Sequence, residues 1–108
     1  MDIAVHFFAG VFLCNCIPHL VSGLLGQPFP TAFSCPPGIG NSSPVVNIIW
    51  GSINVVLGCG LLLYLPFEFG LNTATATLAA GAFITGLILS VHFDKVRRGG
   101  YKGHNERC

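Results

Sequence analysis

The sequence predicts an all-α membrane protein with three transmembrane helices, at about residues 3–25, 44–65 and 72–94, and an ordered Pro/Gly-rich loop between the first two. The chain of 108 residues is 52% hydrophobic and only 8% charged, whereas a soluble domain is about one quarter charged. Glu68 is the only fully charged side chain between Ile3 and Phe93. Because a charged residue at the bilayer centre costs roughly 2.5–3.5 kcal/mol, this distribution indicates repeated membrane crossing.

The first apolar run, residues 3–25, is expected to be a retained helix. No Lys or Arg precedes its apolar part and no small-residue cleavage site follows it, as a secretory signal peptide would require. Residues 26–44 contain five prolines and three glycines, which exclude a regular helix. This segment is uncharged and partly apolar, so we expect it to lie ordered at the membrane surface or to fold back over the bundle.

The second helix has a clear beginning, because Ser43 is suited to cap a helix and Pro44 to occupy its first position. Pro66 marks its end. The third helix is expected to begin near Asn72 or Thr73, either of which can act as its N-cap, and to continue to about residue 94. At 1.5 Å per residue each helix is roughly 30–35 Å long, which is enough to cross a bilayer.

All five Lys and Arg residues follow the third helix. The positive-inside rule therefore predicts a cytoplasmic C-terminus, with residues 95–108 as a basic cytoplasmic tail, and three crossings then place the N-terminus outside. We expect a single integral domain over residues 1–108 in the plasma (inner) membrane of a bacterium. The run from Asn15 to His19, the Pro-rich segment and the polar stripe from Asn47 to Asn54 resemble short multi-spanning bacterial membrane proteins, a resemblance that implies no particular activity.

Polar side chains inside the predicted spans mark the candidate site, because such residues are costly in lipid. On the first helix Asn15 and His19 are one turn apart and share a face. Asn47 and Asn54 share one stripe of the second helix, and His92 lies near the end of the third. The predicted topology brings Asn15, His19, Asn47 and His92 together beneath the Pro-rich loop. A simpler interpretation is that these side chains only hydrogen-bond to neighbouring helices or to headgroup water.

Small residues recur at helical spacing on the second and third helices, which predicts close helix packing. The candidates for helix packing are Gly51, Gly58, Thr77, Gly81, Thr85 and Gly86. Ser52 and Cys59 give the second helix an additional small face. Two small faces exceed what a three-helix monomer needs, so we expect a homo-oligomer or a partner subunit.

The sequence carries few of the patterns that support catalysis or binding. It shows no catalytic acid pair, no Ser-His-Asp set, no zinc-ligand spacing and no basic aromatic patch for nucleic acid. The leading hypothesis is a non-enzymatic structural or accessory subunit, whose partners are the lipid bilayer and copies of itself or a larger membrane complex. One alternative is a homo-oligomeric transporter or channel for a small solute. The other is a haem- or chlorin-binding subunit with His19 or His92 as the axial ligand, although no cofactor is required.

Overall fold

The computed structural model describes residues 2–99, which contain three α-helices: α1 (Asp2–Leu24), α2 (Pro44–Tyr64) and α3 (Thr73–Arg98). No β-strand occurs within these residues. Each helix is long and apolar enough to cross a membrane. The predicted fold class is therefore confirmed: the second helix begins at its predicted residue, and the other helix limits lie within four residues of the predicted ones.

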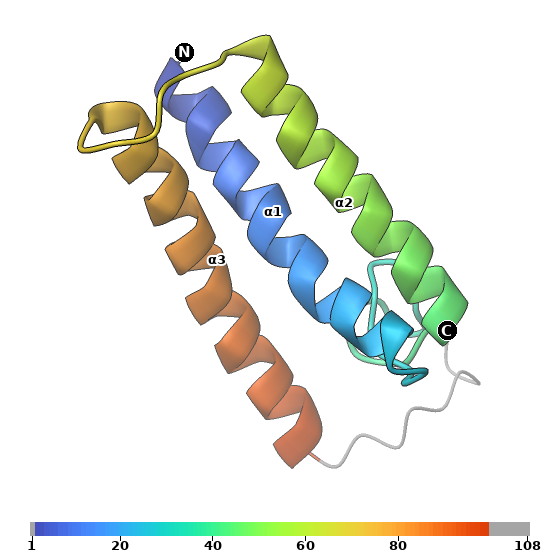
Figure 1. The fold of residues 1–108 in the computed structure, drawn as a ribbon. Coiled ribbons are helices and arrows are strands. Elements are labelled where there is room, and N and C mark those ends of the chain that lie inside the picture. The colour runs from blue at the N-terminus through green and yellow to red at the C-terminus, as the bar shows by residue number, and fades with distance from the viewer. Residues whose placement is uncertain (1, 100–108) are drawn as a thin grey trace.

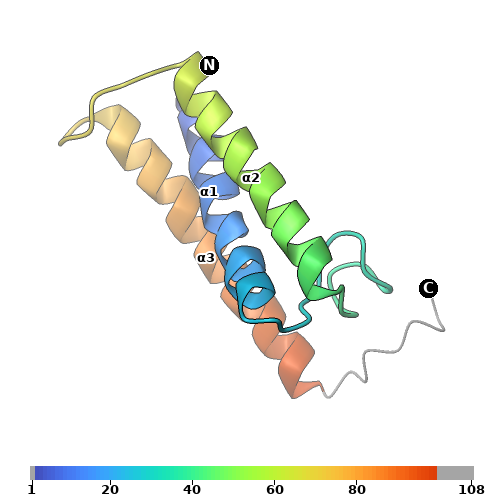
Figure 2. The same ribbon diagram turned by 45° about the vertical axis from the view of Figure 1, so that its right-hand side comes forward.

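Helix α1 lies between the two other helices (Figure 1 and Figure 2). Both α2 and α3 pack along α1, but they make no contact with each other in the part of the chain that the structure describes. α2 runs antiparallel to α1, and α3 returns in the direction of α1. The bundle is therefore open, and the outer faces of α2 and α3 carry large exposed apolar side chains.

The helix boundaries follow from local capping. The hydroxyl of Ser43 accepts a hydrogen bond from the amide of Val46 at 3.2 Å, and Pro44 occupies the first turn of α2. The side chain of Asn72 caps α3 in the same way, accepting from the amide of Thr75 at 2.9 Å. Of the two predicted caps for the third helix, Asn72 is thus the one used.

Helix α3 continues four residues beyond its predicted end and includes the first part of the predicted tail. Lys95, Arg97 and Arg98 occupy its last turn, where positive side chains favour the negative end of the helix dipole. Arg98 also forms an ion pair with Asp94 one turn earlier, at 2.9 Å. Charge and hydrogen bonding therefore extend the helix past its apolar part, while residues 100–108 of the predicted tail lie outside the described residues.

Two glycines allow α1 and α3 to approach at backbone distance. A methyl group added to Gly81 of α3 would collide with the backbone carbonyl of Phe7. A methyl group added to Gly10 of α1 would collide with the carbonyl of Leu78 and lie 2.8 Å from the amide nitrogen of Ala82. Packing of this kind stabilises helix pairs in lipid, where burial of apolar surface gives little driving force.

The α1–α2 interface is built from glycines that receive leucine side chains. Gly51 faces Leu20 and Gly58 faces Leu13, and a methyl group on either glycine would lie under 3 Å from the leucine side chain. Both glycines are buried. These two predicted packing residues therefore lie in a helix interface.

The remaining predicted packing residues make looser contacts. A methyl group on Gly86 would lie 3.7 Å from the sulfur of Cys14, an ordinary van der Waals distance. The hydroxyl of Thr77 donates to the carbonyl of Thr73 in its own helix at 2.7 Å. Thr85 is half-buried. The α1–α3 interface is thus tighter at Gly81 than at Gly86.

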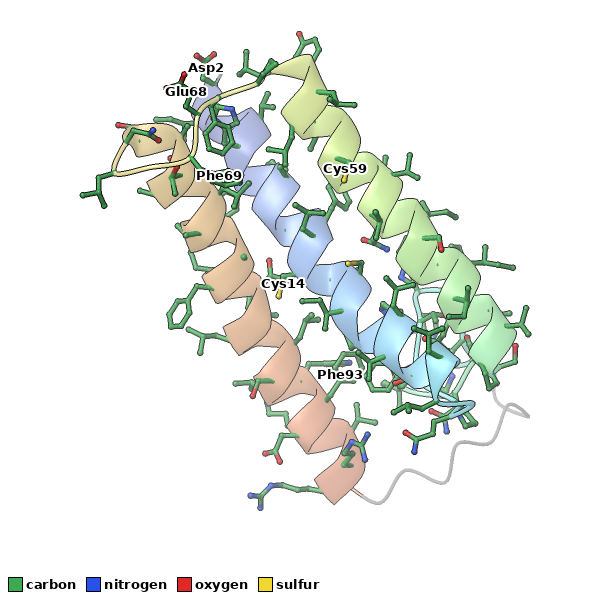
Figure 3. All side chains as sticks on the ribbon, viewed as in Figure 1. Asp2, Cys14, Cys59, Glu68, Phe69 and Phe93 are labelled. Atoms are coloured by element: carbon green, nitrogen blue, oxygen red, sulfur yellow. The ribbon has the colours of Figure 1, made fainter. Side chains whose placement is uncertain are left out.

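The turn between α2 and α3 is attached to the first turns of α1. His6 is buried, and its Nε2 lies 2.8 Å from the carbonyl oxygen of Leu65, while its ring meets that of Phe67 edge-on. Asp2 and Glu68 lie together at this end of the bundle (Figure 3). The carboxylates of Asp2 and Glu68 therefore lie at the end opposite to the basic last turn of α3, where Asp94 is the acidic residue.

The Pro-rich segment at the other end, residues 25–43, is called the loop below. Phe29 and Ser42 exchange two backbone hydrogen bonds, of 3.2 and 3.0 Å, and so bring the two arms of the loop together. The amide of Gly38 donates to the carbonyl of Thr31 at 2.8 Å within the tip. The loop thus supplies part of its own backbone bonding in the absence of regular structure.

Candidate functional site

Asn47 forms the centre of a hydrogen-bonded group where α2 begins. Its side chain is completely buried, and its amide nitrogen lies near three backbone carbonyl oxygens: 2.9 Å from Phe29, 3.3 Å from Ser42 and 3.0 Å from Ser43. Because a carbonyl oxygen only accepts hydrogen bonds, the amide nitrogen of Asn47 must face these atoms and its Oδ1 must face away from them. Asn47 therefore attaches the loop to the first turn of α2.

The Oδ1 atom of Asn47 faces His19 of α1. His19 Nδ1 lies 2.7 Å from it, and the residue is only 3% exposed. Since Oδ1 carries no proton, Nδ1 of His19 must carry one and donate it. In the neutral imidazole the second nitrogen, Nε2, then keeps a free lone pair. The backbone carbonyls around Asn47 thus decide the tautomer of His19 through one intervening side chain.

Asn15 and Asn54 form a second pair in the same interface. Asn54 Nδ2 donates to the carbonyl of Trp50 in its own helix at 2.8 Å, so its Oδ1 points towards α1. Asn15 Nδ2 donates to that oxygen at 3.0 Å. In both pairs, therefore, the α2 asparagine donates to backbone carbonyls and presents its oxygen to a donor on α1.

Each α1 member of these pairs keeps an unused acceptor. His19 Nε2 and Asn15 Oδ1 make no hydrogen bond to any residue in the range 2–99. Within that range no fully enclosed side-chain nitrogen or oxygen lacks a hydrogen-bond partner, so both atoms reach accessible space. A water molecule or another small donor can complete their bonding there.

The sequence spacing places the members of the two pairs on facing sides of α1 and α2. Asn15 and His19 are four residues apart and therefore lie one above the other on α1. Asn47 and Asn54 are seven residues apart and lie on one stripe of α2, together with the buried Gly51. Because the helices are antiparallel, the later residue of α1 meets the earlier residue of α2. The glycine brings the two backbones close enough for short polar side chains to reach across.

His92 does not join the other predicted site residues by a hydrogen bond. Its Nε2 lies 2.6 Å from the carbonyl oxygen of Gly38, so this nitrogen carries a proton and donates to the loop. The adjacent Phe93 packs against Phe29, with ring centroids 4.6 Å apart. The two histidines thus contact the same loop from different helices, His19 beside Phe29 and His92 at Gly38.

Aromatic rings surround the polar group. His19 meets Phe29 and Trp50 edge-on, with centroids 5.6 and 6.5 Å away, and Phe33 meets Trp50 at 5.0 Å. Phe29 is a contact that the sequence did not reveal, because no periodicity identifies which loop residue folds inward. Its position between two prolines, Pro28 and Pro30, is the only local signal.

The site contains few groups that can ligate a metal. Within residues 2–99 no three His, Cys, Asp or Glu side chains are close enough to hold a metal ion together. Cys14, Cys16 and Cys59 are free thiols. The hydrogen-bonded arrangement described above therefore joins helices and loop, and its chemical capacity is that of two hydrogen-bond acceptors in a largely apolar setting.

Comparison with protein-family models, curated proteins and solved structures finds no match for this chain.

Proposed function

We propose that this small multi-pass membrane protein is a non-enzymatic structural or accessory subunit that packs with copies of itself or with a larger membrane complex. The proposal includes the expected location in a bacterial plasma (inner) membrane, with the N-terminus outside and the C-terminus cytoplasmic. The observation that supports the proposal is that the two faces of α2 have different surroundings. One face is occupied by α1, and the other has no partner within residues 2–99.

The occupied face contains the polar and glycine residues that contact α1, namely Asn47, Gly51, Asn54 and Gly58, all of them buried. The opposite face is exposed along its whole length. We name it the outer α2 stripe; its members are Val45, Ile49, Ser52, Val56, Cys59 and Leu63. Their spacing alternates between four and three residues, the pattern by which helices pack side by side.

Ser52 and Cys59 make the outer α2 stripe suitable for a protein neighbour. Large residues alternate with these small ones, so the stripe offers knobs and shallow holes to another helix. Lipid chains can cover an apolar helix whether or not large and small residues alternate along it. Small residues on a lipid-facing surface are therefore better explained by close packing against a second helix.

The internal use of the polar residues supports the same proposal. Asn15, Asn54, His19 and Asn47 bind one another and the loop, so they hold the subunit together. The transport alternative needs these groups to face a solute path, and here their donor groups are engaged within the protein. The haem or chlorin alternative needs an open face at a histidine, whereas His19 is 3% exposed and His92 donates its Nε2 proton to Gly38.

The test uses the full chain in native-like membranes. A membrane-permeant thiol cross-linker should join two copies through Cys59, and Cys59→Ser should abolish that product. The paired substitution Ser52→Leu with Cys59→Leu fills the holes of the stripe and should shift the native mass spectrum towards monomer. Ala79→Leu with Ala80→Leu adds similar bulk to exposed positions of α3 and serves as the control. A wild-type protein that is monomeric and carries no companion chain after gentle extraction would rule out the proposal.

A further inference from the structure

A cleft of about 200 Å³ lies between the loop and the end of α3. Phe29, its neighbouring prolines and Ile39 form the loop side, and Phe93 and Val96 form the α3 side. Asn41 and Arg97 add polar groups to this apolar lining. The cleft therefore combines an apolar surface with a guanidinium and an amide.

The walls of the cleft are attached to the helices at several points. The carbonyl of Phe29 accepts from Asn47 Nδ2 at 2.9 Å, and the rings of Phe29 and Phe93 lie with centroids 4.6 Å apart. His92 holds the tip of the loop through Gly38 at 2.6 Å. In Figure 3 Phe93 projects from α3 towards α1 and the loop. The polar group described above thus fixes one wall of the cleft relative to the other.

The charge of the cleft is not neutralised by the surrounding protein. Arg98 is engaged by both carboxylate oxygens of Asp94 at 2.9 Å, whereas Arg97 makes no ion pair within the described range. The loop contributes no charged residue at all. An anion that enters the cleft therefore meets one free guanidinium and no carboxylate of the loop.

The position of the cleft along α3 matches the boundary between hydrocarbon and water. Phe93 and Val96 are among the last apolar residues of α3, and Lys95, Arg97 and Arg98 form its basic last turn. Long basic side chains at the end of a spanning helix reach to the level of the lipid phosphates. A ligand with a phosphate and an adjoining apolar part is therefore available at this depth in every bilayer.

We propose that this cleft binds the headgroup of an anionic phospholipid. The phosphate accepts charge-assisted hydrogen bonds from Arg97, whose planar guanidinium suits phosphate oxygens, and a further bond from the amide of Asn41. The glycerol and first methylene groups lie on Phe29 and Phe93, and the acyl chains continue along α3 into the bilayer.

The test is a lipid titration of the full chain in detergent, followed by native mass spectrometry. The probes are phosphatidylglycerol and phosphatidylcholine with identical acyl chains. The wild-type protein should retain phosphatidylglycerol in preference to phosphatidylcholine. Arg97→Gln should weaken the retention of phosphatidylglycerol about fivefold, because one cation at a membrane surface contributes about 1 kcal/mol to the binding of an anionic lipid. Arg98→Gln removes the same charge from a side chain already engaged by Asp94, and should change retention less than twofold.

A second pair of variants tests the cleft without changing charge. Val96→Trp fills the cleft and should abolish the preference for phosphatidylglycerol, while Val91→Trp places the same bulk on an exposed position of α3 outside the cleft and should preserve it. Far-ultraviolet circular dichroism of each variant serves to check that its helices are kept.

If Arg97→Gln and Arg98→Gln reduced the retention of phosphatidylglycerol equally, the lipid would be attracted to the basic helix end in general, and the proposal would be overturned. Unchanged binding in both Arg97→Gln and Val96→Trp would overturn it equally. If inorganic phosphate displaces the lipid headgroup at equal concentration, the cleft is a site for free anions and the assignment to a lipid fails. None of these outcomes depends on whether the outer α2 stripe forms an oligomer, so the two proposals are tested separately.

Discussion

His19 and Asn47 share a 2.7 Å hydrogen bond that joins α1 to α2 at the end of the bundle where the loop lies. The amide group of Asn47 turns its other side to the loop carbonyls, including that of Phe29 at 2.9 Å. One short side chain thus connects two helices and the loop. Since that loop forms one wall of the cleft at the end of α3, the interior polar residues and the cleft belong to one connected structure.

The histidine tautomers provide the most direct test of this network. His19 should carry its proton on Nδ1, because it donates to Asn47 Oδ1, whereas His92 should carry its proton on Nε2, because it donates to Gly38. Nitrogen chemical shifts in solid-state NMR of labelled protein in lipid distinguish the two forms within one spectrum. A proton on Nε2 alone in His19 would mean that the Asn47 amide has the opposite orientation.

Removal of the Asn47 side chain should destabilise the fold more than any other single polar deletion in α2. Asn47→Ala leaves His19 Nδ1 without its partner in a buried setting and removes the Asn47 bond to the loop carbonyl of Phe29, which still accepts from the Ser42 amide. The unpaired donor costs about 1–3 kcal/mol. Reversible unfolding in mixed lipid and detergent micelles measures the loss. Ser52→Ala, at an exposed position of the same helix, is the control and should change stability by less than about 0.5 kcal/mol.

The Asn15–Asn54 pair should show measurable but modest coupling. A double-mutant cycle with Asn15→Ala and Asn54→Ala isolates the 3.0 Å hydrogen bond between them. Such bonds between spanning helices are worth about 0.6 kcal/mol on average and up to about 1.7 kcal/mol. Strictly additive losses would contradict the direct contact between the two side chains.

The α1–α3 interface should be intolerant of a single added methyl group. Gly81→Ala places that group against the backbone carbonyl of Phe7, which cannot move aside without displacing α1. We expect a loss of about 1–3 kcal/mol in the same unfolding assay, in line with overpacked interiors. Gly60→Ala is the matched control, because a methyl group there has no neighbour within 4 Å. Equal effects of the two substitutions would contradict the close approach of α1 and α3.

The orientation of the chain in the membrane follows from the distribution of its basic residues and remains a prediction. A fluorescent protein fused after residue 108 should fluoresce in bacterial cells, because it folds in the cytoplasm. Alkaline phosphatase at the same position should be inactive, because it requires export to form its disulfides. The reverse result would place the C-terminus outside and contradict the positive-inside assignment.

The sequence by itself determined the number, type and approximate limits of the helices. These depend on local properties: the cost of charge in hydrocarbon, the capping by Ser43 and Asn72, and the inability of Pro66 to continue a helix. Helical periodicity also identified Asn47 and Asn54 as members of one stripe. Each of these statements needs only a window of residues and the geometry of an α-helix.

The tertiary structure alone decided which polar side chains meet. The choice of Asn47 for His19 and of Asn54 for Asn15 depends on the vertical register of α1 against α2, which no local window contains. Gly10 escaped notice for the same reason, since its importance comes from the point at which α1 crosses α3. The inward position of Phe29, and with it the cleft beside Arg97, depends on the path of a loop that contacts all three helices. Contacts between distant segments follow from how the helices fit together, and that fit is a property of the whole molecule.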